Sequence, residues 1–290
     1  MSTWDSVSLS GVRDRSLRGD SHLRDDVRDS VLRKAEELVS LRGLTVSLSH
    51  LNFDEVIALS GVPRTTAYRV WPRKERFLED LLRRLADTCS PCGGALDEAG
   101  ASAALAALER LSDHLDTPEG RRLVLVEVCR VASQRYFECG RSSPTWLTYL
   151  ALIATMRSLG DDSLSQEIRD RMRRAETKAV ALMAATYETV AGVVGYRLRS
   201  LPGSFTALTH LGAAASEGML LLADIRPDAS ARLGEIDPFL TGRLAEWSLP
   251  AIGYASTVLG LLEPDPAFDL AVARARLAEH SLRRQDPVPA

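Results

Sequence analysis

Apolar residues recur at helical spacing along almost the whole chain, and this periodicity constrains the fold more than any other feature. Leu23, Val27 and Val31 begin one such series, and later segments repeat the pattern. No run alternates apolar and polar residues as a half-buried strand would. The sequence therefore predicts an all-α fold. Beyond the glycines at 93 and 94, we expect helices near 101–115, 118–139, 145–159, 163–194, 204–223, 238–262 and 266–284.

Composition places the chain among ordinary globular proteins. Of 290 residues, 45% are hydrophobic and 26% charged, and the net charge is −3. Four cysteines are too few for a disulfide scaffold, and no apolar run approaches the roughly 18 residues that span a bilayer. The N-terminus has no apolar segment typical of a secretory signal. We expect a cytoplasmic protein with no membrane partner.

The positions of glycine and proline divide the chain into three parts. Residues 1–21 are rich in Ser, Asp and Arg without a period and are predicted to be a flexible tail. Residues 22–90 are predicted to form a small helical domain that ends in a Cys-Ser-Pro-Cys-Gly-Gly hinge. Residues 91–290 are predicted to form a larger helical bundle.

Within the small domain, two short helices are predicted on either side of a glycine. Asn52 is suited to cap the first of them, and Gly61 allows a tight turn after it. Pro63 suits the first position of the second helix, which ends before Trp71-Pro72. Two short helices packed on a longer one form the helix-turn-helix arrangement.

The second short helix has the two faces that DNA recognition requires. On a helical wheel, a polar and basic set falls on one arc, while Ala67 and Val70 fall opposite, with Thr66 beside them. The segment 61–74 contains four basic residues and no acidic one. Arg73 and Lys74 lie at the start of the next helix, where side-chain charge and free N–H groups together hold phosphate. The polar arc consists of Arg64, Thr65, Tyr68 and Arg69.

The segment NFDEVIALSGVPRTTAYRVWPRKERFLEDLL resembles the DNA-binding domain of the TetR (tetracycline-repressor) family of bacterial regulators. The resemblance covers about residues 25–85. Beyond it, the chain is similar only in being a long helical body, which such proteins use for dimerisation and ligand sensing. The matching features are Val56-Ile57, Gly61-Val62, Thr66, Tyr68, Trp71-Pro72 and Lys74-Glu75, with Ala35 and Arg42-Gly43 upstream.

The resemblance implies that the polar arc faces the major groove and that Thr66, Tyr68 and Lys74 contact phosphate. Three positions depart from the family pattern. Val70 replaces a frequent histidine, Pro63 a frequent serine, and Asp54 an arginine that contacts bases in some members. An acid at that position would repel phosphate. The predicted DNA-binding set is Asn52, Arg64, Thr65, Thr66, Tyr68, Arg69, Arg73 and Lys74.

No pattern for catalysis is found. The sequence contains no GxGxxG, GxxxxGK[ST], GxSxG or HExxH motif, so we expect neither an enzyme nor a cofactor. A structural metal site is not expected either, because Cys129 and Cys139 lack a paired spacing. Cys89 and Cys92 form a CxxC, whose alternatives are a redox switch and a hinge with incidental thiols.

The body contains a candidate ligand pocket and a candidate dimer interface. Aromatic and methionine residues at helical spacing indicate an apolar small-molecule site, with ordinary core as the alternative. Small and large apolar residues on two later helices indicate a four-helix interface, with internal packing as the alternative. The pocket set is Tyr136, Phe137, Trp146, Tyr149, Met156, Met172, Met183 and Tyr187. The interface set is Leu208, Leu211, Ala215, Leu220, Trp247, Ile252 and Leu259.

Together these patterns favour a homodimeric DNA-binding transcriptional regulator. We expect a repressor that binds a double-stranded, pseudo-palindromic operator and is released by an apolar small-molecule inducer. Two alternatives stay open. The first is a TetR-like regulator without a ligand, or an activator. The second is an all-α enzyme or binding protein that uses the small domain as a scaffold.

Overall fold

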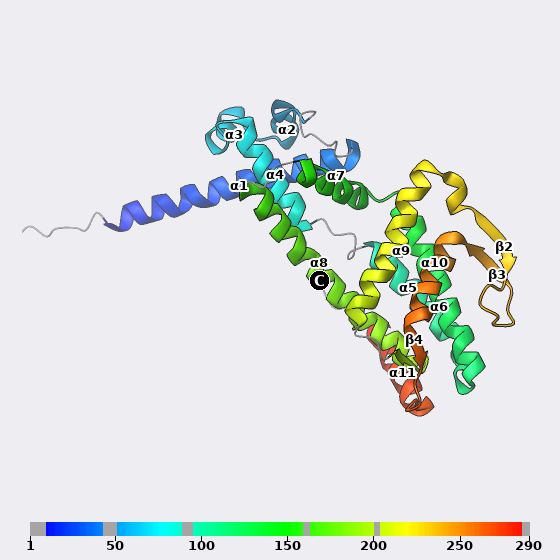
Figure 1. Cartoon of the computed structure of the whole chain (residues 1–290). Helices are drawn as coiled ribbons and strands as arrows, with labels where there is room; N and C mark the ends of the chain where they lie inside the picture. Colours follow the sequence, from blue (N-terminus) through cyan, green and yellow to red (C-terminus); the bar gives the residue numbers. More distant parts are fainter. Residues whose placement is uncertain (1–9, 43–50, 89–94, 159–162, 200–203, 286–290) are drawn as a thin grey trace, which may run out of the picture. The chain divides into compact units, whose positions relative to one another are not determined.

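The computed structural model of the chain describes residues 10–42, 51–88, 95–158, 163–199 and 204–285 (Figure 1). Helices account for most of these residues, and the strands are few and short. The fold is all-α. Within the described segments, no helix is long and apolar enough to cross a membrane.

The chain divides into two compact units. Unit 1 comprises residues 1–89 and 144–175, and unit 2 comprises residues 90–143 and 176–290. Helix α8 (Ser163–Val193) contributes residues to both. The sequence had placed everything after residue 90 in one body. The division differs because Leu152, Ile168 and Met172 are buried in the apolar core of unit 1.

Unit 1 is built around its first helix, α1, which packs against α2, α3, α4 and α7. This helix begins at Ser10, so the predicted tail of residues 1–21 is helical from that residue onward. The stretch contains no proline, and its charged residues are compatible with a solvated helix. The helices are α1 (Ser10–Arg42), α2 (Phe53–Ser60), α3 (Arg64–Val70), α4 (Lys74–Thr88) and α7 (Pro144–Ser158).

Aromatic rings from three elements form the centre of unit 1. The ring of Phe53 stacks on Phe77 at a centroid distance of 4.5 Å and meets the edge of Trp71 at 6.0 Å. Trp71 and Phe77 are fully buried. Because Phe53 begins α2, Trp71 follows α3 and Phe77 lies in α4, this cluster fixes the positions of the three helices relative to one another.

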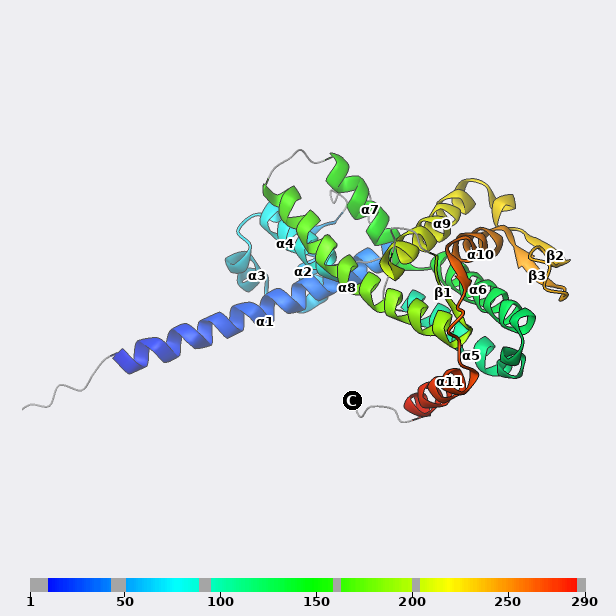
Figure 2. The same cartoon turned by 60° about the horizontal axis from the view of Figure 1, so that its bottom comes forward.

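Unit 2 is a helical bundle organised around α6, which packs against α5, α9 and α10 (Figures 1 and 2). Helix α8 adds Val190, Ala191 and Val193 to the same core, and Val194, just after the helix, joins them. A short 3-10 helix, η2 (Ser112–Asp116), precedes α6, and a second, η3 (Pro227–Ser230), follows α9. The helices are α5 (Ala95–Arg110), α6 (Pro118–Gly140), α9 (Phe205–Ile225), α10 (Leu249–Leu261) and α11 (Leu270–Gln285).

Two short antiparallel strand pairs accompany this bundle, and the sequence analysis missed both. Strand β1 (Tyr196–Leu198) pairs with β4 (Leu262–Pro264), with Tyr196 opposite Pro264. Strand β2 (Arg232–Ile236) pairs with β3 (Ala245–Ser248). With three to five residues each, these strands are too short to give a clear alternating pattern.

The β2–β3 hairpin corrects the prediction of one helix over 238–262. Helix α10 begins only at Leu249, where the Ser248 side chain accepts a hydrogen bond from the N–H of Ala251. Before it, the Asp237 carboxylate accepts hydrogen bonds from the N–H groups of Thr241 and Gly242. These bonds close a loop and lower the pKa of Asp237 below its usual value.

The aromatic cluster yields a stability prediction. Phe77→Ala removes a fully buried ring and leaves a cavity between α2 and α4, so we expect a loss of about 3–5 kcal/mol in the free energy of unfolding. Urea unfolding of the full chain, followed by circular dichroism and tryptophan fluorescence, measures it. Leu59→Ala, at a half-exposed position of α2, is the control and should change stability by less than about 0.5 kcal/mol. Equal effects of the two variants would contradict the role of the cluster.

Candidate nucleic-acid interface and ligand cavity

The turn between α2 and α3 has the predicted local structure. The Asn52 side chain accepts a hydrogen bond of 3.0 Å from the N–H of Asp54, which confirms the cap of α2. Gly61 adopts a φ of +72°, a left-handed conformation that is strained for residues with a side chain. Pro63 lies one position earlier than predicted, as the residue that precedes α3, and its carbonyl accepts from the N–H groups of Thr66 and Ala67.

Helix α3 has one buried and one exposed face. Ala67 is fully buried, while Arg64, Thr65 and Arg69 are exposed. Thr66 and Tyr68 are half-buried. The exposed positions are those of the predicted polar arc, with Tyr68 at its edge.

Basic residues continue from α3 to the start of α4. Arg73 is exposed just before α4, and Lys74 is its first residue. Among the described residues, Arg69 and Arg73 form no ion pair, so their charges face solvent without a neutralising acid. Asn52 is also exposed, at the start of α2. The eight predicted DNA-binding residues all lie between the start of α2 and the start of α4, within unit 1.

An acid lies within this region. The carboxylate of Asp54 accepts a hydrogen bond of 3.0 Å from the Arg64 guanidinium and one of 2.9 Å from the Tyr68 hydroxyl. The Arg64 guanidinium also lies 5.4 Å from the centre of the Tyr68 ring. The resemblance implied that Tyr68 contacts phosphate, but here its hydroxyl proton is directed at Asp54.

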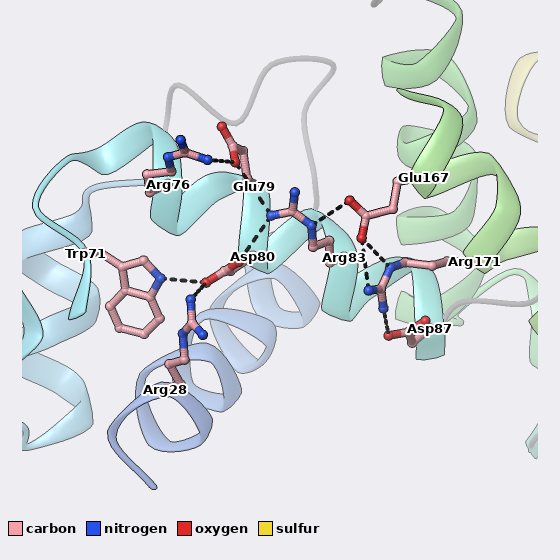
Figure 3. Close-up of polar contacts among 9 residues, drawn as sticks. All are labelled: Arg28, Trp71, Arg76, Glu79, Asp80, Arg83, Asp87, Glu167 and Arg171. Atoms are coloured by element: carbon pink, nitrogen blue, oxygen red, sulfur yellow. Dashed lines mark hydrogen bonds and ion pairs between the residues drawn. The ribbon is translucent and has the colours of Figure 1, made fainter. Parts of the chain in front are cut away.

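Helix α4 is connected to its neighbours by a chain of polar contacts, shown in Figure 3. The Asp80 carboxylate accepts from the Trp71 indole N–H at 2.8 Å, from Arg28 of α1 at 2.8 Å and from Arg83 at 3.2 Å. Arg83 in turn donates to Glu167 of α8 at 2.9 Å. This hydrogen bond lowers the pKa of Glu167, with burial opposing it and Arg171 adding to it.

A cavity of about 90 Å³ lies inside unit 2. Its walls come from α5, α6, α8, α9 and α10, with Leu262 of β4, and no charged side chain lines it. On α5 and α9 the wall consists mainly of small residues, such as Gly100, Ala104, Gly212 and Ala213. The absence of large side chains at these positions leaves the space open.

The polar groups of the cavity are neutral hydroxyls and one thiol. The hydroxyls of Tyr187 and Tyr254 are hydrogen-bonded to each other at 2.7 Å. Ser133 and Thr209 also line the wall, but each donates to a backbone carbonyl. Burial raises the pKa of the Cys129 thiol to about 12, so this thiol stays protonated at neutral pH.

The cavity includes three of the eight predicted pocket residues: Tyr136, Met183 and Tyr187. The other five do not line it. Met172 belongs to the core of unit 1, and Tyr149 and Met156 pack against that core. Trp146 is buried in α7, where its ring stacks on Tyr149 at 6.0 Å. Phe137 is buried in α6 outside the cavity lining.

The predicted dimer interface also requires correction. Leu208, Leu220 and Trp247 are buried inside a single chain, where Leu208 lines the cavity and Leu220 packs against Gly140. Ile252 and Leu259 pack partly against the same core, and Ala215 is half-buried. Only Leu211 of the set is well exposed. The correction has a simple cause, because α9 and α10 use their inner faces to pack on α6.

The outer face of α9 is apolar and uncovered within the described chain. On α9, exposed Leu211, Ala214, Gly218, Leu222 and Ile225 follow one another at intervals of three or four residues. Helix α10 contains no charged residue at all. A Cβ atom built at Gly218, Gly253 or Gly260 meets nothing within 4 Å.

Some sequence predictions fall outside the described residues, among them the CxxC of Cys89 and Cys92. In the segments that the structure describes, no group of three or more His, Cys, Asp or Glu side chains is arranged to hold a metal ion.

The chain is similar in structure to a solved protein. No protein-family model matches the chain, and no curated protein matches it. A solved structure, the reduced form of NemR from E. coli, aligns over 82% of this chain and 99% of its own, with a TM-score of 0.44 and 15% sequence identity.

Proposed function

We propose that the chain is a homodimeric, DNA-binding transcriptional regulator that releases its operator when a small neutral molecule occupies the cavity of unit 2. The observation that carries the proposal is the helix-turn-helix of α2 and α3. Its exposed face presents Arg69 without an acidic partner among the described residues, and Arg73 follows it. In such a motif the second helix enters the major groove and reads base edges, while flanking basic groups hold phosphate.

Dimerisation is supported by the outer face of α9 and by the absence of charge on α10. A row of exposed apolar residues without charge is costly in water, and monomeric proteins rarely expose a large contiguous patch of this kind. The open glycines at 218, 253 and 260 allow a second helix pair to approach closely. In a dimer with two-fold symmetry, the exposed row of each chain would pack against the same row of the other chain, so that both are covered.

The chemistry of the cavity defines the class of ligand. Its volume is below that of sites for drug-sized ligands and closer to the ~150 Å³ of an apolar cavity that binds benzene. Its walls carry no charge, so an ion would lose its hydration without compensation. The paired hydroxyls of Tyr187 and Tyr254 offer one polar contact. We therefore infer a neutral ligand with about one aromatic ring and a hydroxyl group.

The first test concerns DNA. Selection from a random duplex library should yield a pseudo-palindromic site, and Arg69→Ala should weaken binding to it by about 1–3 kcal/mol with relaxed preference at one base pair. Arg73→Ala should weaken binding to all sequences and reduce the salt slope by about one unit. Fluorescence anisotropy at several salt concentrations measures both. Arg173→Ala, at an exposed arginine of α8, is the control. The proposal fails if no duplex is selected.

The second test concerns assembly. Leu222→Glu places a charge on the outer face of α9, where dimerisation would bury it without a partner, so we expect a monomer with weaker operator binding. Analytical ultracentrifugation gives the mass. Val272→Glu introduces the same charge at a half-exposed position of α11 and should leave the dimer intact. A monomeric wild type, or a dimeric Leu222→Glu variant, would rule out this interface.

The third test concerns the cavity. Phenol should raise the thermal unfolding temperature more than toluene does, and benzoate should have no effect because its charge is excluded. Ala213→Phe fills the cavity and should abolish the response, whereas Ala271→Phe on the exposed side of α11 should keep it. Anisotropy then shows whether phenol releases DNA from wild type but not from Ala213→Phe. An equal response to all three compounds would contradict the assigned ligand class.

A further inference from the structure

The acidic residue in the basic region of unit 1 carries an inference that rests on the proposed function. Asp54 lies in the first turn of α2, and both oxygens of its carboxylate are used. One accepts from Arg64 and the other from Tyr68, both of which are on α3. The Tyr68 ring in turn packs against Phe53 at 5.4 Å. The Arg64 guanidinium is thereby held by an ion pair with Asp54 and by the ring of Tyr68, which itself packs on Phe53 of α2.

The pair remains accessible to a partner. The Arg64 side chain is 69% exposed and that of Asp54 is 45% exposed. One terminal nitrogen of Arg64 donates to Asp54, and a guanidinium carries five N–H donors in a rigid fork. The remaining donors and the exposed side of the carboxylate therefore present a donor group next to an acceptor group.

This combination matches one kind of base pair. In the major groove, guanine presents the acceptors O6 and N7, and its cytosine partner presents the N4 amino donor. Arginine pairs with the guanine edge, and a carboxylate accepts from cytosine. An A·T pair places the adenine amino donor between its acceptors N7 and O4, so it lacks the two adjacent acceptors that a guanidinium binds with two of its N–H groups. Any DNA that leaves the carboxylate without a cytosine donor instead faces an anion close to its phosphates.

We propose that Asp54 determines sequence specificity by holding Arg64 in position for a G·C pair and by repelling DNA that lacks one. Two opposite effects on affinity follow. At the correct site, Asp54 adds a base contact and a pre-positioned arginine. At other sites it adds repulsion. Its net contribution is therefore to the ratio of specific to non-specific binding.

The test compares Asp54→Asn with wild type on two duplexes, the selected operator and a scrambled sequence of equal length. Asparagine keeps the shape and an oxygen acceptor but removes the charge. We expect tighter binding to the scrambled duplex and a fall of about tenfold in the specificity ratio. Repeated selection should lose the G·C preference at one position in each half-site. Glu75→Gln on α4 removes the same charge elsewhere in unit 1 and should leave the ratio unchanged.

A double-mutant cycle isolates the contact. If Asp54 acts through Arg64, Asp54→Asn should change the specificity ratio far less in an Arg64→Ala background than in wild type. A wild-type chain that selects an operator, combined with an unchanged ratio in Asp54→Asn, would overturn this inference alone. A wild-type chain that selects no duplex would overturn the proposed function and this inference together. Circular dichroism checks that each variant remains folded.

Discussion

The orientation of α3 depends on the hydrogen bonds that the Asp80 carboxylate accepts. This carboxylate accepts from the indole N–H of Trp71, the residue that follows α3, and from Arg28 of α1. The same group accepts from Arg83, which continues to Glu167 of α8. Three helices and the end of a fourth are thus joined through a few charged groups, most of them partly shielded from water (Figure 3). Helix α3 has only seven residues and has no stability of its own, so its direction must come from contacts of this kind.

Local chemistry made the region of α2 and α3 the most predictable part of the chain. The cap at Asn52, the left-handed turn at Gly61 and the burial of Ala67 follow from neighbouring residues alone, and all three are confirmed. The contact between Arg83 and Glu167 spans 84 positions and has no local signal. For the same reason, nothing in the sequence of α7 indicated that it belongs to unit 1.

The cavity shows a different limit of sequence reasoning. Aromatic and methionine residues were the signal for a pocket, yet most of them fill space. Met172 packs in the core of unit 1, whereas the cavity exists where Gly100, Ala104 and Ala213 leave room. A small residue opens a cavity only if its neighbours on other helices are also small, and that depends on how the helices align. The hairpin before α10 was missed because its two strands have only five and four residues, too few for a clear alternating pattern.

The charge-free surface of α10 has a consequence for how much of this protein a cell can keep folded. If its outer face is covered only when two chains meet, folding and association become one equilibrium, and the apparent stability rises with the amount of protein present. A chain made in small quantity would then spend more time with this surface open and be degraded faster. There would then be a threshold concentration of the protein. Below it, a newly made chain would be degraded before it met a second chain to pair with.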